Sequence, residues 1–524
     1  MDHEGESQEL TSFTQMLADG GTDRDTQSVI QDDRDMYRMG NTQELQRNFH
    51  TLSILGLTCV VLTTWTAILA SSTFSLINGG RAGSIYVYIG TWICTLPVTA
   101  SLAEMASMAP TAGGQYHWVS EFSPPAFQRP LSYTAAWLAA LGWQTFIAAS
   151  AYGAAVLILL MASVGHSTYV PQPWHETLLT IFIGFCSLLF NVFGAKRLPL
   201  FEGVVLVLYI LGFFVIVIPL WVLADKVPIR HIFTDFGNFG GWPSTGIACI
   251  VGQTAATTAF IGVDCATHMA EEVRKASRAV PRMMILTIMV NGTLGFVMLV
   301  TYISVIQDVE KQIVDSKSPY PLIGVFVDAT NYIGGICMTV PIAVMSFFGC
   351  INAIMAASRQ VWSFSRDDGM PFSSWWKKVV SVEGTPIPLN SMIGSLAILI
   401  VIALLNLASS EVVNSVFGLI GASVGMNYIM SISCVLWRRL CGESLPDSPF
   451  KLGRWGIPIN AFAVAFQTFS TVISFFPLFS RPTGRNMNWS IAILSGVALI
   501  GILNYFTFAR GKYRGPVTRV RKHS

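Results

Sequence analysis

Long apolar segments, separated by short charged or Pro- and Gly-rich stretches, make up most of the chain. A helix needs about 20 apolar residues to cross a hydrocarbon core of ~30 Å, and most of these segments reach that length. The pattern gives twelve candidate spans, at 51–78, 82–108, 131–161, 176–194, 198–224, 246–270, 282–306, 331–364, 388–407, 411–437, 457–480 and 489–509. It predicts an all-α polytopic membrane protein with 12 transmembrane helices.

Two of these spans carry small or polar residues at mid-depth, where a lipid-facing helix would carry Leu, Ile or Phe. They are "LASSTFSLINGG" at 69–80 and "TTAFIGVDCATH" at 257–268. Unwound backbone at membrane depth must be buried in protein or line a watery cavity. Interrupted helices at matching positions of two halves are typical of transporter binding sites. Close helix packing is the alternative reading of the small residues.

Spans 1 and 6 are five apart, as an inverted repeat of five plus five helices requires. We therefore expect one repeat at 51–224 and the other at 246–437, with two further helices at 457–509. Asp264 stands within the sixth span, and an aspartate at this depth is expensive and by default a functional candidate. Two roles are open for it: contact with a substrate ammonium group, and uptake and release of a proton.

The Lys and Arg residues are distributed unequally between the loops. With the N-terminus in the cytosol, 21 of them fall on the inner side and 7 on the outer side, leaving out the N-terminal tail. Inner loops carry the excess of positive charge, so both termini are expected in the cytosol. Residues 1–50, with eleven Asp or Glu against four Arg, are expected to form a disordered acidic tail. Residues 510–524 form a basic tail that contacts anionic lipid or only marks the inner side.

The composition, 52% hydrophobic and 12% charged, excludes an ordinary soluble chain. The net charge of +2 gives no reason to expect a nucleic-acid partner. A membrane enzyme is disfavoured because the sequence contains neither HExxH nor GxSxG, and the absence of a P-loop motif disfavours a nucleotide-driven pump. The nine cysteines are dispersed without metal-ligand spacing, so neither a metal nor a cofactor is expected.

Three motifs carry a family resemblance. "EMASMAPTAGGQYHWV" at 104–119, "NVFGAKRLPLFEG" at 191–203 and "GVDCATHMAEEVRKASRAVPR" at 262–282 resemble segments of the amino acid–polyamine–organocation transporters. Together they are most similar to the fungal amino acid/choline transporter branch, which includes permeases for γ-aminobutyrate, choline and amino acids. The resemblance runs from about residue 48 to residue 510.

The resemblance implies a leucine-transporter-type fold with discontinuous helices 1 and 6 and a central site between spans 1, 3, 6, 8 and 10. The first-span motif of the superfamily, Gly-Ser-Gly with Phe two residues on, is matched here only at Ser71 and Phe74. The missing glycines argue against a backbone clamp on a substrate carboxylate. The candidate substrate-binding residues are Ala70, Ser71, Ser72, Thr73, Phe74, Trp143, Tyr152, Phe260, Ile261, Gly262, Val263, Asp264, Asn352 and Asn427.

Aromatic residues on spans 1, 3 and 6 offer a cation–π box for a quaternary ammonium group, with core packing as the alternative. The candidates are Trp65, Trp143, Tyr152 and Phe260. The candidate coupling or gating residues are Asp264, Glu104, Glu202, Glu271 and Glu272. Glu202 is expected either to act in coupling or to pair locally with Lys196 and Arg197. Glu271 and Glu272 form either a solvated charge cluster or a cytosolic latch to Glu104 or to the loop around Arg366.

These patterns predict a secondary active transporter, coupled to H⁺, for a small amine or amino acid such as γ-aminobutyrate or choline. It is expected in the plasma membrane, with the vacuolar membrane as the alternative. A receptor of the same fold that binds a nutrient without transporting it is the alternative function. Which substrate is taken, and the oligomeric state, stay open at this point.

Overall fold

Helices form most of the part of the chain that the computed structural model describes, which is residues 24–40, 42–166, 168–316, 318, 320–407, 410–484, 487–518 and 520. The longer helices are α3 (Thr51–Leu62), α4 (Thr64–Ile77), α5 (Gly80–Met108), α7 (Gln128–Gly165), α8 (Pro173–Phe193), α9 (Leu198–Leu223), α11 (Thr245–Thr258), α13 (Ala276–Val305), α15 (Tyr332–Arg366), α17 (Leu389–Leu405), α18 (Ser410–Leu440), α19 (Gly456–Ile473) and α20 (Ser490–Asn504). The shorter ones are α2 (Arg24–Met39), α6 (Gln115–Phe122), α10 (Ile229–Thr234), α12 (Cys265–His268), α14 (Leu322–Ala329), α16 (Ser373–Trp376) and α21 (Arg510–Lys512).

The twelve predicted spans are matched in part. Among the described residues, ten helical segments are long and apolar enough to cross a membrane, with α3 and α4 together forming the first. The sixth and ninth predicted spans correspond to α11, of 14 residues, and α17, of 17 residues, which fall below that length. Helix α11 is short because the chain unwinds directly after it.

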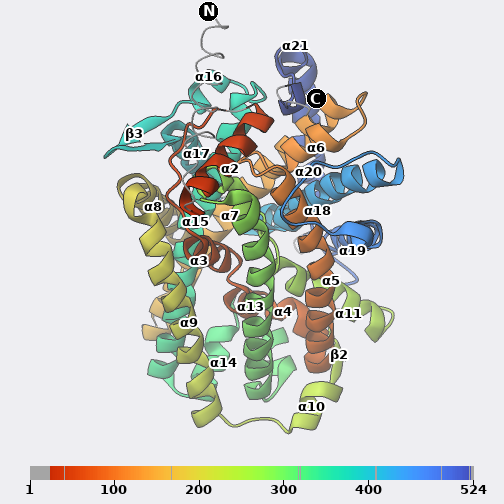
Figure 1. The fold of residues 1–524 in the computed structure, drawn as a ribbon. Helices are drawn as coiled ribbons and strands as arrows, with labels where there is room; N and C mark the ends of the chain where they lie inside the picture. Colours follow the sequence, from red (N-terminus) through yellow and green to blue (C-terminus); the bar gives the residue numbers. More distant parts are fainter. Residues whose placement is uncertain are drawn as a thin grey trace, which may run out of the picture.

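The helices form a bundle in which α7 and α15 pack along each other. Helices α2, α6, α16 and α21 lie at one end of this bundle, which we call the α2 end (Figure 1). Helices α10 and α14 lie at the opposite end, which we call the α10 end. The first and last helices of the described chain therefore share one end of the molecule.

The first span is interrupted, but not where the sequence predicted. Thr63 separates α3 from α4 with the left-handed dihedral angles φ 37° and ψ 44°. Residues 70–74 lie within the continuous helix α4, so the expected unwinding there is wrong. Their small side chains serve helix packing instead, because the Ser71 hydroxyl donates to the Ala255 carbonyl of α11 at 3.2 Å.

The sixth span is interrupted where the sequence predicted. Helix α11 ends at Thr258, the chain turns through residues 259–264, and α12 begins at Cys265. Gly262 has φ +105°, a conformation that a residue with a Cβ rarely adopts. A Cβ at this position would also lie 3.3 Å from Val61 Cγ1, so the turn is pressed against the end of α3.

The sequence predicted a disordered tail over residues 1–50, but residues 24–40 include helix α2 and residues 42–50 are also described. Residues 1–23 lie outside the described residues, as do 519 and 521–524 of the expected basic tail. Helix α2 is ordered because its Met36 and Met39 side chains are buried against the bundle. Beyond it, Phe49 pairs with Val273 in an isolated bridge, which fastens the segment to the chain between α12 and α13.

Two short antiparallel strand pairs join helices at the ends of the bundle. Strand β1 (Asn78–Gly79) pairs with β2 (Phe236–Asn238), and β3 (Val380–Val382) pairs with β4 (Thr385–Ile387). A cavity of about 260 Å³ lies beside β1 and β2 and is lined in part by Arg81, Asp235 and Asp308. This cavity does not include Asp264.

Candidate functional site

Asp264 is the centre of a fully buried polar cluster just after the turn of the sixth span. Its Oδ1 accepts a hydrogen bond from the Tyr428 hydroxyl of α18 at 2.5 Å. Its Oδ2 accepts from Gln115 Nε2 of α6 at 2.8 Å and from Trp143 Nε1 of α7 at 3.3 Å. His268 Nε2, one helical turn further along the chain, lies 3.4 Å from the same oxygen. We call these five residues the Asp264 cluster.

The cluster ties three other helices to the interrupted span. Asp264 is 1% exposed, and an ionised carboxylate is tolerated at such a position only when charges and donors compensate it. Three neutral donors and one imidazole surround it, so both of its oxygens are occupied by protein groups. A cation brought to Asp264 would therefore have to displace one of these contacts.

The four aromatic candidates do not form one box. Trp143 contacts Asp264, and its ring stands edge-on to His268 at 5.5 Å. Trp65 packs against Tyr209 of α9, with ring centroids 5.6 Å apart, and Phe260 packs against Tyr88 at 5.4 Å. These two rings are buried as core side chains, which was the alternative reading.

Tyr152 lies farther along α7. It is nine residues beyond Trp143, a separation of about 13 Å along a helix, and its hydroxyl donates to Glu176 Oε2 at 3.0 Å. Phe74 of α4 is 44% exposed. The structure therefore brings neither residue to Asp264.

The remaining polar candidates occupy separate places. Asn352 of α15 donates to Glu202 Oε2 of α9 at 3.1 Å, so Glu202 has an amide as its partner and not the Lys196–Arg197 pair. Asn427 lies next to Tyr428 on α18, and its buried Oδ1 has no hydrogen-bond partner among the described residues. Ile261 and Val263 are buried in the turn of the sixth span, beside Gly262.

Four buried ion pairs lie at the α2 end, and we call them the ion-pair layer. Their eight side chains are at most 12% exposed. The pairs and their shortest distances are Glu271–Arg366 at 2.9 Å, Glu272–Arg359 at 2.7 Å, Glu104–Arg439 at 2.7 Å and Glu121–Arg38 at 2.7 Å. Two of them join α15 to the chain after α12, the third joins α5 to α18, and the fourth joins α6 to α2.

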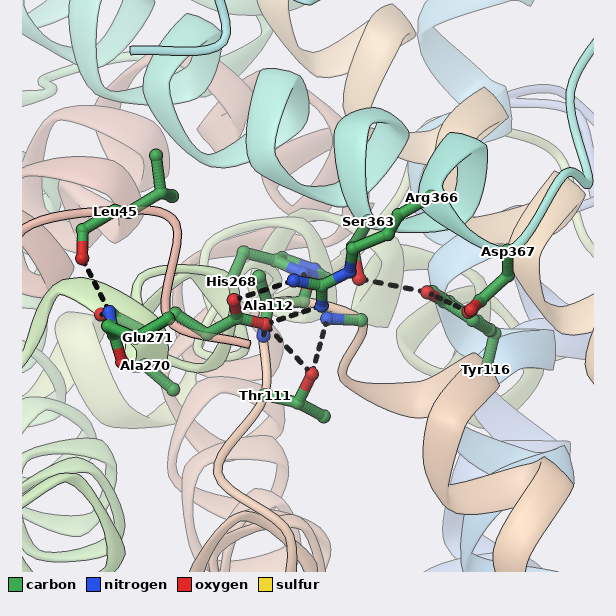
Figure 2. A network of polar contacts seen from close by, with 12 residues as sticks. Leu45, Thr111, Ala112, Tyr116, His268, Ala270, Glu271, Ser363, Arg366 and Asp367 are labelled. Carbon is green, nitrogen blue, oxygen red and sulfur yellow. Dashed lines mark hydrogen bonds and ion pairs between the residues drawn. The ribbon is translucent and has the colours of Figure 1, made fainter. Parts of the chain in front are cut away.

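Glu271 has the most donors in this layer (Figure 2). It accepts from Arg366 Nη1 and Nη2 at 3.1 and 2.9 Å, from the Thr111 hydroxyl at 3.1 Å and from the Ala112 amide at 3.1 Å. The Arg366 guanidinium also lies over the Trp362 ring, 4.5 Å from its centroid. Glu271 and Glu272 are thus buried and paired rather than solvated, and the side chain that pairs with Glu271 is Arg366 and not Glu104.

Helix α2 takes part in this layer through Arg38. The guanidinium donates to Glu121 Oε1 at 2.7 Å and to the Met108 carbonyl at 2.5 Å. Burial opposes ionisation of Glu121, but the His117 imidazole, 3.6 Å from its Oε2, and the charge of Arg38 outweigh burial and hold its pKa below the usual 4.5. The lowered pKa means that the contribution to stability is present above pH 4.5 and is lost as the pH falls through that lowered pKa.

We therefore expect Arg38→Ala to release α2 at neutral pH. A hydrogen bond to a charged group contributes about 1.5–3 kcal/mol, so amide hydrogen exchange in residues 43–50 and 270–276 should accelerate about tenfold or more. Hydrogen exchange followed by mass spectrometry measures this directly. Arg34→Ala is the matched control, because Arg34 is exposed on the same helix. Equal exchange in the two variants would contradict the role assigned to Arg38.

Sequence reasoning missed several residues of the cluster and of the layer. His268 follows Asp264 by four residues, the spacing that places two side chains on one face of a helix. Gln115 lies within the motif at 104–119, and Tyr428 is adjacent to a candidate. The arginine partners lie far from their glutamates in the chain, so their pairing required the three-dimensional arrangement.

No group of three or more His, Cys, Asp or Glu side chains in the described part of the chain is placed to hold a metal ion. The Asp264 cluster likewise has one carboxylate and one imidazole with neutral donors.

Comparison with known proteins identifies relatives along nearly the whole chain. The choline transporter of Saccharomyces cerevisiae is 29% identical over 474 residues, covering 90% of this chain and 82% of that protein. The GABA-specific permease of the same yeast is 26% identical over 531 residues, covering 95% and 87%. Amino-acid permease 2 of Neurospora crassa is 26% identical over 507 residues, covering 94% and 90%.

The fold is also similar to that of a solved transporter. A mutant of the Eremococcus coleocola manganese transporter superimposes with a TM-score of 0.57 over 90% of this chain and 96% of its own, at 13% identity. At that identity the likeness concerns the fold alone.

These findings confirm the sequence-based assignment to a family and the expectation that the chain is no enzyme. The apolar helices and the permease relatives show an integral, multi-pass membrane protein. A family model described as amino acid permease matches residues 49–497. This chain belongs to the amino acid permease family.

Proposed function

We propose that this protein is a secondary active transporter that takes up a small amino acid or amine together with protons. The choline, GABA and amino-acid permeases among its relatives support that substrate class. We propose the plasma membrane as its location, with the vacuolar membrane as the alternative.

The observation that carries the proposal is the meeting of the two interrupted spans. The Thr64 hydroxyl, one residue after the break in the first span, donates to the Ala259 carbonyl of the second break at 2.8 Å. Gly262 lies against Val61 on the other side of the same break. Where two backbone interruptions face each other inside a bundle, N–H and C=O groups without helical partners are available to bind a substrate, as in transporters with broken helices.

In this proposal the chain crosses the membrane twelve times, α11–α12 and α17 included, with spans 1–5 and 6–10 as inverted repeats. The distribution of Lys and Arg assigns the α2 end and both termini to the cytosol. The ion-pair layer then closes the cytosolic side, and the Asp264 cluster lies between this layer and the breaks. Uptake requires both the ion-pair layer and the Asp264 cluster to open.

Removing one partner from a buried ion pair costs about 3–5 kcal/mol, whereas separating the two charges into water costs much less. Opening to the cytosol, which hydrates both partners, is therefore compatible with the layer. A buried substrate charge that loosens the Asp264 cluster would favour that opening, because a ligand shifts an equilibrium only by its differential affinity.

The test is uptake of radiolabelled choline, γ-aminobutyrate and a panel of amino acids into cells that express the chain, with and without a proton uncoupler. We expect saturable uptake of at least one compound, reduced by the uncoupler. Binding of a compound without its accumulation would favour the receptor alternative. Accumulation that the uncoupler leaves unchanged would contradict proton coupling.

A further inference from the structure

His268 is the one imidazole of the Asp264 cluster, and its two nitrogens have different surroundings. Nδ1 lies 2.8 Å from the Ala112 carbonyl oxygen, which only accepts, so Nδ1 carries a hydrogen. Nε2 faces Asp264 Oδ2 at 3.4 Å and has no other hydrogen-bond partner among the described residues. The imidazole is 0% exposed, so no solvent supplies a partner in this conformation.

The hydrogen bonds around the His268–Asp264 pair determine which of the two side chains takes up a proton. The Asp264 carboxylate already accepts from Tyr428, Gln115 and Trp143, and these hydrogen bonds stabilise its ionised form. A proton added to the pair therefore resides on His268 Nε2 and makes a neutral ion pair with Asp264. Its departure leaves one uncompensated negative charge in the protein interior, which is costly.

The chain between α5 and α6 connects this pair to the ion-pair layer. Ala112 accepts from His268 with its carbonyl and donates with its amide to Glu271 Oε1 at 3.1 Å, as Figure 2 shows. Glu271 in turn holds Arg366. Gly114, with φ +55°, brings the same segment so close that a Cβ there would lie 3.2 Å from His268 Cε1.

We propose that His268 is the residue that carries the coupling proton, and that Ala112 links its protonation to the Glu271–Arg366 pair. This inference rests on the proposed proton-coupled uptake. A proton from the outer solution binds His268 Nε2, and the neutral His268–Asp264 pair keeps the α2 end closed. Opening of the α2 end exposes Nε2 to the cytosol, where the proton leaves it. The deprotonated pair leaves Asp264 uncompensated in the interior, so loss of the proton favours the open conformation, in which water reaches Asp264.

The other titratable or charged groups around the pair do not suit this task. Phenols and thiols in water titrate near pH 10 and pH 8.5, above the range of pH 5 to 8 in which imidazoles titrate. The arginines and glutamates of the ion-pair layer neutralise each other. Glu202 has the Asn352 amide as its hydrogen-bond partner and lies outside the series of contacts that runs from His268 through Ala112 to Glu271. The groups in question are Tyr428 from α18, Cys265 from α12 itself, Cys59 from α3, Glu202 from α9, and the pairs that Arg359 and Arg366 of α15 make with Glu272 and Glu271.

The first experiment follows opening of the α2 end without any substrate. Cys265 is 0% exposed beside Asp264, so it reacts with an impermeant maleimide in inside-out vesicles only when this end opens. Maleimide reacts with the thiolate, whose fraction itself rises with pH, so each labelling rate is divided by that of the denatured protein at the same pH. With Cys265 as the sole cysteine, we expect this ratio to rise about tenfold between pH 5 and 8. His268→Gln should abolish this pH dependence, and His231→Gln, at an exposed histidine of α10, should preserve it.

The second experiment separates the proton-carrying role from a structural one. In proteoliposomes, with the compound that the uptake assay identifies, His268→Gln should still exchange labelled for unlabelled substrate but should not accumulate it along a pH gradient.

Accumulation and a pH profile like those of the unmodified protein would overturn the inference and leave the transporter proposal intact. Absence of gradient-driven accumulation in the unmodified protein would overturn proton coupling and this inference together. Loss of exchange in both His268→Gln and His268→Ala would also overturn it, since the role would then be structural.

Discussion

Asp264→Asn should lower the uptake rate at least about 100-fold while the amount of protein in the membrane stays unchanged. The substitution removes the charge that pairs with His268 and replaces an acceptor with a donor, so hydrogen bonds of about 1.5–3 kcal/mol each are lost from the cluster. The side-chain volume is nearly conserved, so the fold should tolerate the change. Radiolabelled uptake, normalised to surface biotinylation, measures the effect.

The matched control for this prediction is Asp447→Asn. Asp447 pairs with Lys451 on the surface, where its side chain is 92% exposed, and exposed pairs contribute at most about 1 kcal/mol. This variant should transport normally. Normal transport by Asp264→Asn would show that the cluster is not needed for uptake.

Arg366→Ala should open the α2 end. It leaves Glu271 buried with only the Thr111 hydroxyl and the Ala112 amide as donors, and an uncompensated buried charge costs about 3–5 kcal/mol. Because opening hydrates Glu271 and relieves this cost, labelling of Cys265 from the cytosolic side should accelerate about 100-fold or more. Concentrative uptake should fall, since a protein that stays open on this side no longer retains its substrate.

An exposed pair of a basic and an acidic side chain provides the control for the ion-pair layer. Lys377 and Asp368 lie 3.1 Å apart with side chains 41% and 49% exposed, so Lys377→Ala should change the labelling rate no more than about fivefold. A similar labelling rate in Arg366→Ala and Lys377→Ala would contradict the role of the ion-pair layer.

The sequence predicted the class and the sixth-span break well, because these depend on local signals. A run of apolar residues reports burial in lipid directly, and Asp264 beside Gly262 marks a position that a continuous helix would not favour. The break in the first span was placed too late. Thr63, which takes the left-handed conformation, has no local signature that distinguishes it from other threonines in an apolar helix.

The side-chain partners could be predicted only where they are close in sequence. His268 was within reach through its spacing from Asp264, whereas Tyr428 and Arg439 meet their carboxylates across more than 150 residues of chain. For Trp65 and Phe260, the sequence suggested a shared binding site that the structure does not contain. Aromatic residues on the expected spans suggested a binding box, but their rings fill gaps between neighbouring helices.

The N-terminal segment shows why composition alone misleads. Its acidic residues predicted disorder, yet Asp32 accepts hydrogen bonds from the Lys275 and Ala276 amides at 2.8 and 3.1 Å. These are the first amides of α13, which have no partners within their own helix. An acidic segment that finds a helix N-terminus becomes ordered on it.

The most direct test of the account asks whether substrate occupies the space where the two broken spans meet. The variants Thr63→Cys and Ile261→Cys place a thiol at each break, and Phe74→Cys places one on the exposed face of α4. Saturating transported substrate should slow maleimide labelling of the first two and leave the third unchanged. Substrate that is still transported but protects neither break would contradict the account.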